Sequence, residues 1–280
     1  MNNRTMKKFV NHLPKQIILW IITLIILAPF YWMVSTSLKE FSKVLLFPPQ
    51  WWPNPLQWGN YAELFLKRPF HLYLFNSLYI AAIVTIGTCI FAALAGYAFA
   101  KLNFPFKNVI FLVLLSSMMI PTEVTAIPMF IWLGKLGLVN THFPLILPPM
   151  LGAGGMFGVF LCRQFYITIP LDLDEAAKID GCSPWITFRK IMLPLATPAM
   201  ATLSIFTFLH SWNEFFEPLV YLNSNKLYTI PLALSLFTTE SGTDWQLIMA
   251  ASVVATVPLL IVFFFAQKKF IEGVALTGLK

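Results

Sequence analysis

The chain has 280 residues, of which 58% are hydrophobic and only 11% are charged. Because a soluble domain has about 25% charged residues, this composition excludes an ordinary soluble protein and predicts a membrane protein. The net charge of +7 comes from basic residues beside apolar segments, which indicates membrane topology rather than a nucleic-acid-binding face.

The first predicted element is a membrane span at about residues 17–37. Basic residues precede this apolar run, as they also do in a secretory signal peptide. The run is long and no A-x-A site follows it, so we expect an uncleaved span. Residues 38–71 then form a connection rich in proline and tryptophan. Prolines at this density disfavour a helix, and the tryptophans are typical of a membrane–water boundary, although a binding role for them stays open.

Five more apolar runs follow, each close to the roughly 20 residues that span a bilayer. Together they predict an all-α membrane protein with six transmembrane helices in a single domain, residues 1–280. Lysine and arginine are more frequent at both ends, in the 101–108 turn and in the loop at residues 163–194 than in the opposite connections. This excess predicts that both termini and the 163–194 loop are cytoplasmic. The five spans are expected at about residues 72–100, 109–131, 143–162, 195–222 and 246–266.

Small residues recur in two of the predicted spans. Gly154 and Gly158 form a G-x-x-x-G pattern, and Ala92, Ala95 and Gly96 form a small-residue patch. Such residues let helix backbones approach closely. We expect ordinary intramembrane packing, either within this chain or against another subunit.

Ionisable residues inside membrane spans are costly and therefore suggest function. Glu123 lies between two prolines, where a broken helix could expose it to a translocation pathway; a position at the outer boundary is the alternative. Trp212, Asn213 and Glu214, with Glu217 nearby, could stack on a sugar ring and bond its hydroxyl groups. A structural role for these side chains between helices is an equally supported interpretation.

The 163–194 loop is unusually polar for its apolar surroundings. Asp172 and Glu175 have the spacing of a capping box, and Gly181 is a plausible left-handed stop for a short helix. Ser183 can cap a second helix with Pro184 at its first position. Alanines at positions 176 and 177 leave one face of the short helix smooth, so the loop is a candidate docking surface.

Several kinds of chemistry are absent from the sequence. Its three cysteines show no C-x-x-C spacing and its four histidines are scattered, which argues against a disulfide framework or a metal site. No G-x-x-x-x-G-K-[ST] loop occurs, so any ATP must be hydrolysed by a partner.

The loop carries a family resemblance. Its E-A-A-x3-D-G sequence, followed by I-x-L-P, resembles the EAA loop of ABC importer permeases. S-W-N-E-F at residues 211–215 and the C-terminal Q-K-K-F-I-E-G-V-A-L-T-G-L-K are similar to the carbohydrate-importer branch, specifically the second permease of a maltose-type system. The likeness extends from the first apolar span to the last residue. It departs at Cys182, where the family usually has a small residue, and at Lys280, where the family continues with a further glycine.

The resemblance implies a type I ABC importer permease fold in a bacterial or archaeal inner membrane. It implies a second permease subunit, an ABC ATPase dimer and an extracytoplasmic solute-binding protein as partners, besides membrane lipid. The chain would bind no cofactor, and ATP and Mg would be used by the ATPase. By the same resemblance, ATPase coupling falls to Asp172, Glu175, Ala176, Ala177, Asp180 and Gly181, and a further contact falls to the tail at Lys268, Lys269, Gly273 and Gly278.

An alternative of another class is a secondary transporter driven by an ion gradient, with Glu123 or Glu214 as the ion site. It leaves the EAA-like loop unexplained. A membrane-embedded enzyme is unsupported because no nucleophile–base pair or metal constellation occurs. The absence of lysine and arginine deep in the spans favours a neutral sugar over a phosphorylated solute.

Overall fold

The computed structural model describes residues 3–239 and 242–277, with the side chains of residues 14–238, 242–265 and 267. The described chain is mostly helical, which confirms the predicted all-α class. Its one hairpin pairs β1 (Thr238–Thr239) antiparallel with β2 (Gly242–Thr243). Four helical stretches are long and apolar enough to cross a membrane, and the number rises to six if each of two bent pairs is one span. The four are Pro14–Ser37, Phe70–Lys101, Phe143–Thr168 and Trp245–Phe265.

Contacts divide the chain into two compact units, Met1–Arg68 with Leu236–Val257, and Pro69–Ser235 with Pro258–Lys280. The first unit contains α1 (Asn3–Ser37), the 3-10 turn η1 (Phe41–Lys43), α2 (Gly59–Lys67) and the beginning of α14 (Trp245–Thr277).

The proline-rich connection after α1 folds back onto the end of that helix. The Tyr31 hydroxyl and the Ser35 hydroxyl both donate to the carbonyl of Trp51, at 3.0 and 2.6 Å. The rings of Trp32 and Trp51 meet edge to face at 5.5 Å. Apart from η1, residues 38–57 form no helix, as the prolines predicted, but the predicted connection at 38–71 also contains the helix α2. The interfacial role of its exposed tryptophans stays a prediction.

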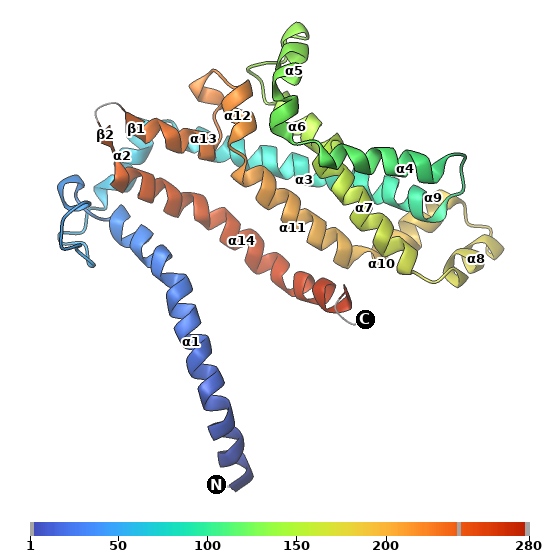
Figure 1. Cartoon of the computed structure of the whole chain (residues 1–280), viewed down its shortest axis with the longest axis horizontal. Helices are drawn as coiled ribbons and strands as arrows, with labels where there is room; N and C mark the ends of the chain where they lie inside the picture. The colour runs from blue at the N-terminus through green and yellow to red at the C-terminus, as the bar shows by residue number, and fades with distance from the viewer. Residues whose placement is uncertain (1–2, 240–241, 278–280) are drawn as a thin grey trace. The chain divides into compact units, whose positions relative to one another are not determined.

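The second unit is built around the long helix α3 (Phe70–Lys101). Helices α7 (Ala153–Thr168) and α11 (Thr197–Asn213) pack against it, and α6 (Phe143–Leu151) adjoins α7 (Figure 1). Of the predicted small residues, Ala92, Gly96 and Gly158 lie at these contacts, whereas Gly154 is exposed. A Cβ added at Gly96 would lie 2.6 Å from the Cys162 Cβ, and one added at Gly158 would lie 2.8 Å from the Ala92 Cβ. The packing expected of these residues therefore occurs within this chain.

Two of the predicted spans are bent, and in the third the break lies beside Glu123, where the flanking prolines suggested a broken helix. The third consists of α4 (Lys107–Ser116), η2 (Ser117–Met119) and α5 (Thr122–Lys135), with a turn of 97° between Lys107–Met119 and α5. Pro121 sits in this break with extended backbone angles and has no N–H to continue the helix.

The predicted span at 195–222 was wrong in its bounds. Helix α11 begins at Thr197, after a bend of 73° from Pro184–Leu195, and ends at Asn213. A separate short helix, α12 (Phe216–Tyr221), follows a break at Glu214 and Phe215. The remaining elements of this region are η4 (Asn225–Leu227), α13 (Ile230–Leu234) and η5 (Ser235–Phe237).

Candidate functional site

The 163–194 loop contains the predicted short helix, α8 (Asp172–Ile179), but its start differs from the prediction. The N-cap is Leu171, whose backbone is already helical, and no side chain caps the helix. The N–H of Glu175 donates to the Leu171 carbonyl at 3.0 Å. The predicted capping box was therefore wrong: Asp172 is inside the first turn, where its side chain cannot take the N-cap geometry. It still places negative charge at the positive end of the helix dipole.

The end of α8 follows the prediction. Gly181 has a φ of +73°, and the N–H of Cys182 donates to the Ala177 carbonyl at 2.9 Å, which is the bond that defines a Schellman stop. The Ser183 hydroxyl then accepts from the N–H of Ile186, with Pro184 at the first position of α9 (Pro184–Thr187). A five-residue π-helix (Phe188–Met192) and α10 (Leu193–Leu195) complete the return.

The candidate coupling residues are divided between two faces of α8. Glu175, Ala176 and Asp180 are exposed, as are Asp172 and Gly181. Ala177 is buried and faces the body of the protein. The candidate docking surface therefore excludes Ala177, and it includes the apolar side chain of Ile179, which is 86% exposed.

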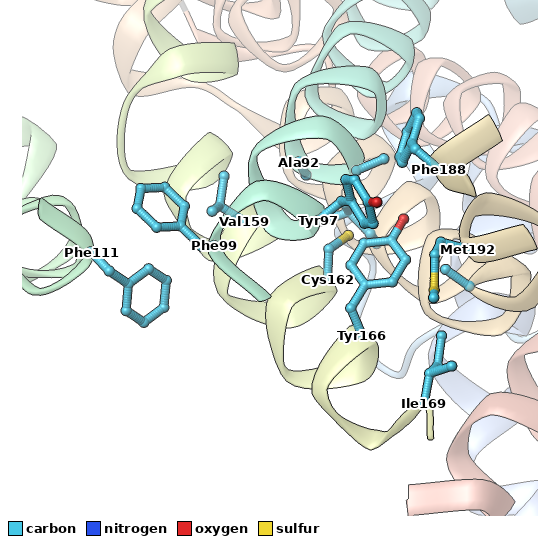
Figure 2. Close-up of a cluster of buried hydrophobic side chains, with 13 residues drawn as sticks. Ala92, Tyr97, Phe99, Phe111, Val159, Cys162, Tyr166, Ile169, Phe188 and Met192 are labelled. Atoms are coloured by element: carbon cyan, nitrogen blue, oxygen red, sulfur yellow. The ribbon is translucent and has the colours of Figure 1, made fainter. Parts of the chain in front are cut away.

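A buried aromatic cluster joins the loop to the helices beneath it (Figure 2). Phe188 and Met192, from the return of the loop, pack in one core with Tyr97 of α3 and Tyr166 of α7. The rings of Tyr97 and Phe188 are 5.3 Å apart, and the Tyr97 hydroxyl donates to the Pro184 carbonyl at 3.3 Å. The loop is thus held against α3 and α7 by this apolar packing and by the Tyr97 hydrogen bond.

A second candidate site is a cavity of about 950 Å³ in the same unit, lined by α3, α5, α6, α7, α11 and α12. Its walls are mainly apolar. Among the lining residues there is neither lysine nor arginine. The polar side chains around it are those of Ser117, Thr122, Thr125, Thr207, His210, Ser211, Asn213, Glu214, Glu217 and Thr229.

The structure separates the predicted pathway residues. Asn213 and Glu214 line the cavity. Trp212 does not: it is buried and stacks on Phe208 with ring centroids 5.7 Å apart, so its indole face is already covered. Glu123 is exposed and is absent from the cavity lining, whereas its neighbour Thr122 belongs to it.

Glu214 has a defined structural role. Its Oε1 accepts from the N–H groups of Phe216 and Glu217, at 2.9 and 3.1 Å, and so satisfies the first turn of α12. Its Oε2 lies 3.7 Å from Nδ1 of His210. The Asn213 amide donates to the carbonyl of Leu209, four residues earlier on α11.

The residues of the predicted tail contact lie only partly within the described part of the chain. Lys268, Lys269 and Gly273 belong to the backbone of α14, and their side-chain surroundings are outside the described part of the chain. Gly278 lies outside the described residues. Within the described part, no group of three His, Cys, Asp or Glu side chains is arranged to hold a metal.

The sequence reasoning overlooked several polar cavity residues, among them Thr122, Thr125 and His210. The helical spacing of Thr122 to Thr125, and of His210 to Asn213, could have revealed them as pairs on one helix face. It also treated Lys101 only as a topology signal, although this lysine contacts the loop.

Comparison with known proteins gives the family. Residues 89–275 match the family described as "binding-protein-dependent transport system inner membrane component". The chain is 37% identical over 247 residues to the arabinooligosaccharides transport system permease protein AraQ of Halalkalibacterium halodurans, covering 88% of this chain and 86% of AraQ. It is 31% identical to the lactose transport system permease protein LacG of Rhizobium radiobacter, covering 88% of each.

A solved structure shares the fold. A chain of a bacterial ABC transporter involved in the import of the acidic polysaccharide alginate superposes with a TM-score of 0.79 at 22% identity, over 96% of this chain and 99% of that one. These findings confirm the resemblance seen in the EAA-like loop. The chain belongs to the family of binding-protein-dependent transport system inner membrane components and is a sugar ABC transport permease.

Proposed function

We propose that this chain is the membrane subunit of an ATP-driven carbohydrate importer that couples to its ATPase through the exposed face of α8. The chain itself performs no covalent chemistry. ATP binding closes the ATPase dimer, the docked α8 moves with it, and the permease opens its pathway outward until hydrolysis resets it. ATP and Mg belong to the ATPase.

The observation that carries the proposal is the construction of the 163–194 loop. Its short helix presents Glu175, Ala176 and Asp180 to solvent and ends at a sharp glycine turn. The π-helix that follows, Phe188–Met192, packs against α3 and α7 through the buried side chains of Phe188 and Met192. A surface that is exposed on one side and packed firmly on the other can pass a displacement from a partner to the membrane helices.

The cavity supports an uncharged carbohydrate as the solute. A phosphate, sulfonate or carboxylate group is commonly bound by cationic side chains, and the cavity lining contains neither lysine nor arginine. Hydroxyl and amide groups with two carboxylates, by contrast, are suited to sugar hydroxyls. Arabinooligosaccharides and lactose, for which two relatives are named, belong to this uncharged class, whereas a relative that is 31% identical is named for sn-glycerol-3-phosphate.

The proposed assembly follows from the same assignment. A second permease completes the pathway, two ATPase subunits dock beneath it, and an extracytoplasmic solute-binding protein delivers the sugar. A related solved transporter was crystallised in complex with a periplasmic protein bound to an alginate pentasaccharide. The excess of basic residues in the 163–194 loop and at both ends supports a cytoplasmic position for them.

Uptake by reconstituted vesicles tests the energy source and the solute class. The assembled complex with its solute-binding protein is supplied in turn with labelled arabino-oligosaccharide, lactose and alginate oligosaccharide. We expect uptake of a neutral sugar that requires ATP and survives an ionophore. Uptake that continues without ATP and collapses with the ionophore would instead identify an ion-gradient transporter.

A further inference from the structure

Lys101 is a buried cation at the point where three elements meet. It is the last residue of α3, and its side chain is only 5% exposed. Its Nζ lies 2.7 Å from Oδ2 of Asp174, in the first turn of α8. The same Nζ donates to the carbonyl of Ile169 at 2.9 Å, where α7 has just ended.

Both charges are suited to their positions. A cation at the C-terminus of α3 and an anion at the N-terminus of α8 each interact favourably with the local helix dipole. The Asp174 side chain is 13% exposed, so neither charge is freely solvated. Removing one partner would leave the other buried and unpaired, which is strongly unfavourable.

Two other cations lie at the same end of α3 and have different partners. Lys107 Nζ donates to the carbonyls of Leu102 and Ala100, at 2.7 and 3.4 Å, and so closes the turn into α4. Arg163 Nε donates to the Phe99 carbonyl at 3.3 Å, joining α7 to α3. Of these three basic residues, Lys101 is the one with a recorded ion pair to α8 in the described part of the chain.

We propose that Lys101 is a positioning residue that makes α3 the element through which movement of α8 reaches the transport cavity. The inference rests on the proposed function. A displacement imposed on α8 pulls directly on the end of α3 through the Lys101–Asp174 pair, and Tyr97 holds the other side of the loop through the Pro184 carbonyl.

The geometry of α3 supports this route. The helix is continuous from Phe70 to Lys101 and has no proline inside it. Ile80 and Val84, farther along the same helix, line the cavity. At 1.5 Å per residue, Val84 is about 25 Å from Lys101 along the axis. A shift at the Lys101 end is therefore delivered to the cavity wall by one uninterrupted helix.

The test uses the complete transporter in proteoliposomes and measures two quantities, solute uptake and ATP hydrolysis, to give the solute carried per ATP. In Lys101→Met the complex should still hydrolyse ATP, while solute per ATP falls by about fivefold or more, the usual lower range of coupling between sites. Lys101→Arg should retain the ratio. The exchange Lys101→Asp with Asp174→Lys restores the ion pair and should therefore recover the solute carried per ATP. The recovery should be only partial, because each charge of the reversed pair is unfavourable for its local helix dipole.

Lys107→Met is the matched control, since it removes a lysine that bonds carbonyls at the same helix end. The solute carried per ATP by this variant should stay near the wild-type value. An unchanged ratio in Lys101→Met, or an equal loss in Lys107→Met, would overturn the inference. If Lys101→Met fails to assemble, Asp174→Asn provides the same comparison with the same two outcomes. A wild-type complex that contains no ATPase would refute the proposed function itself, which is a separate result.

Discussion

At the scale of single residues, Gly96 and Gly158 set how closely the helices of the second unit approach one another. An added Cβ at Gly96 would lie 2.6 Å from Cys162 Cβ and 3.0 Å from the backbone N of Arg163. Neither atom is the end of a flexible side chain that could move aside. Gly134, in contrast, lies in α5 with its nearest neighbour, a Val139 methyl group, at 3.9 Å.

We predict that Gly96→Ala lowers the free energy of unfolding in detergent by about 1–3 kcal/mol, because the clash between α3 and α7 outweighs the better helix propensity of alanine. Gly134→Ala is the control, and it should raise that free energy by up to about 1 kcal/mol. Thermal unfolding followed by circular dichroism gives both values. Equal shifts of the same sign would show that helix approach at Gly96 is not limiting.

The single-residue features that local chemistry determines were predictable from the sequence. Gly181 and Ser183 act as predicted because a left-handed stop and a hydroxyl cap depend on few neighbours. Lys39 counts in the sequence only as one of the basic residues of the connections opposite the 163–194 loop, but it is 1% exposed, with Nζ 3.8 Å from the centroid of the Trp32 ring. Burial lowers the pKa of this lysine. Such an environment arises from tertiary folding, which the charge pattern does not encode.

At the scale of elements, the break between α11 and α12 gives Glu214 its structural role. The carboxylate bonds two N–H groups at the start of α12, which would otherwise face the cavity without a partner from the helix. A structural role is one of the two interpretations that the sequence left open, beside sugar contact, and the two lead to different expectations for the charge.

We predict that Glu214→Gln retains both stability and uptake, since its amide oxygen can still accept from the two N–H groups. Glu214→Ala should lower the free energy of unfolding by about 1 kcal/mol, the usual value of a lost N-terminal cap. Unfolding and sugar uptake are measured on the same preparations. Loss of uptake in a stable Glu214→Gln variant would show instead that the negative charge takes part in transport.

Hydropathy predicted where the apolar segments lie but not the direction of the chain inside them. The segments at 109–131 and 195–222 were each expected as one span, with a broken helix suggested only around Glu123, and the structure bends or divides both. Pro121 was visible in the sequence. The size of the bend was not, because the angle depends on how α5 packs against α12, far away in the sequence.

At the scale of the whole molecule, the proposed function depends on a mechanical connection between the candidate docking surface on α8 and the cavity. The family and the loop could be predicted from the sequence because the EAA-like motif is contiguous. The cavity could not, because its lining comes from six separate helices. The Lys101–Asp174 contact joins residues 73 positions apart and likewise appears only in the fold.

The central claim, docking of an ATPase by α8, is tested most directly by purifying the tagged chain from native membranes and identifying the bound proteins. The wild type should bring down a second permease and an ATPase. Glu175→Lys reverses the charge of an exposed docking residue, and Gly181→Pro cannot adopt the φ of +73° that ends α8. Both variants should keep the permease partner and lose most of the ATPase, while Lys135→Glu, an exposed change on α5, should lose neither. Undiminished ATPase recovery with Glu175→Lys and Gly181→Pro, or a wild-type chain purified alone, would contradict the account.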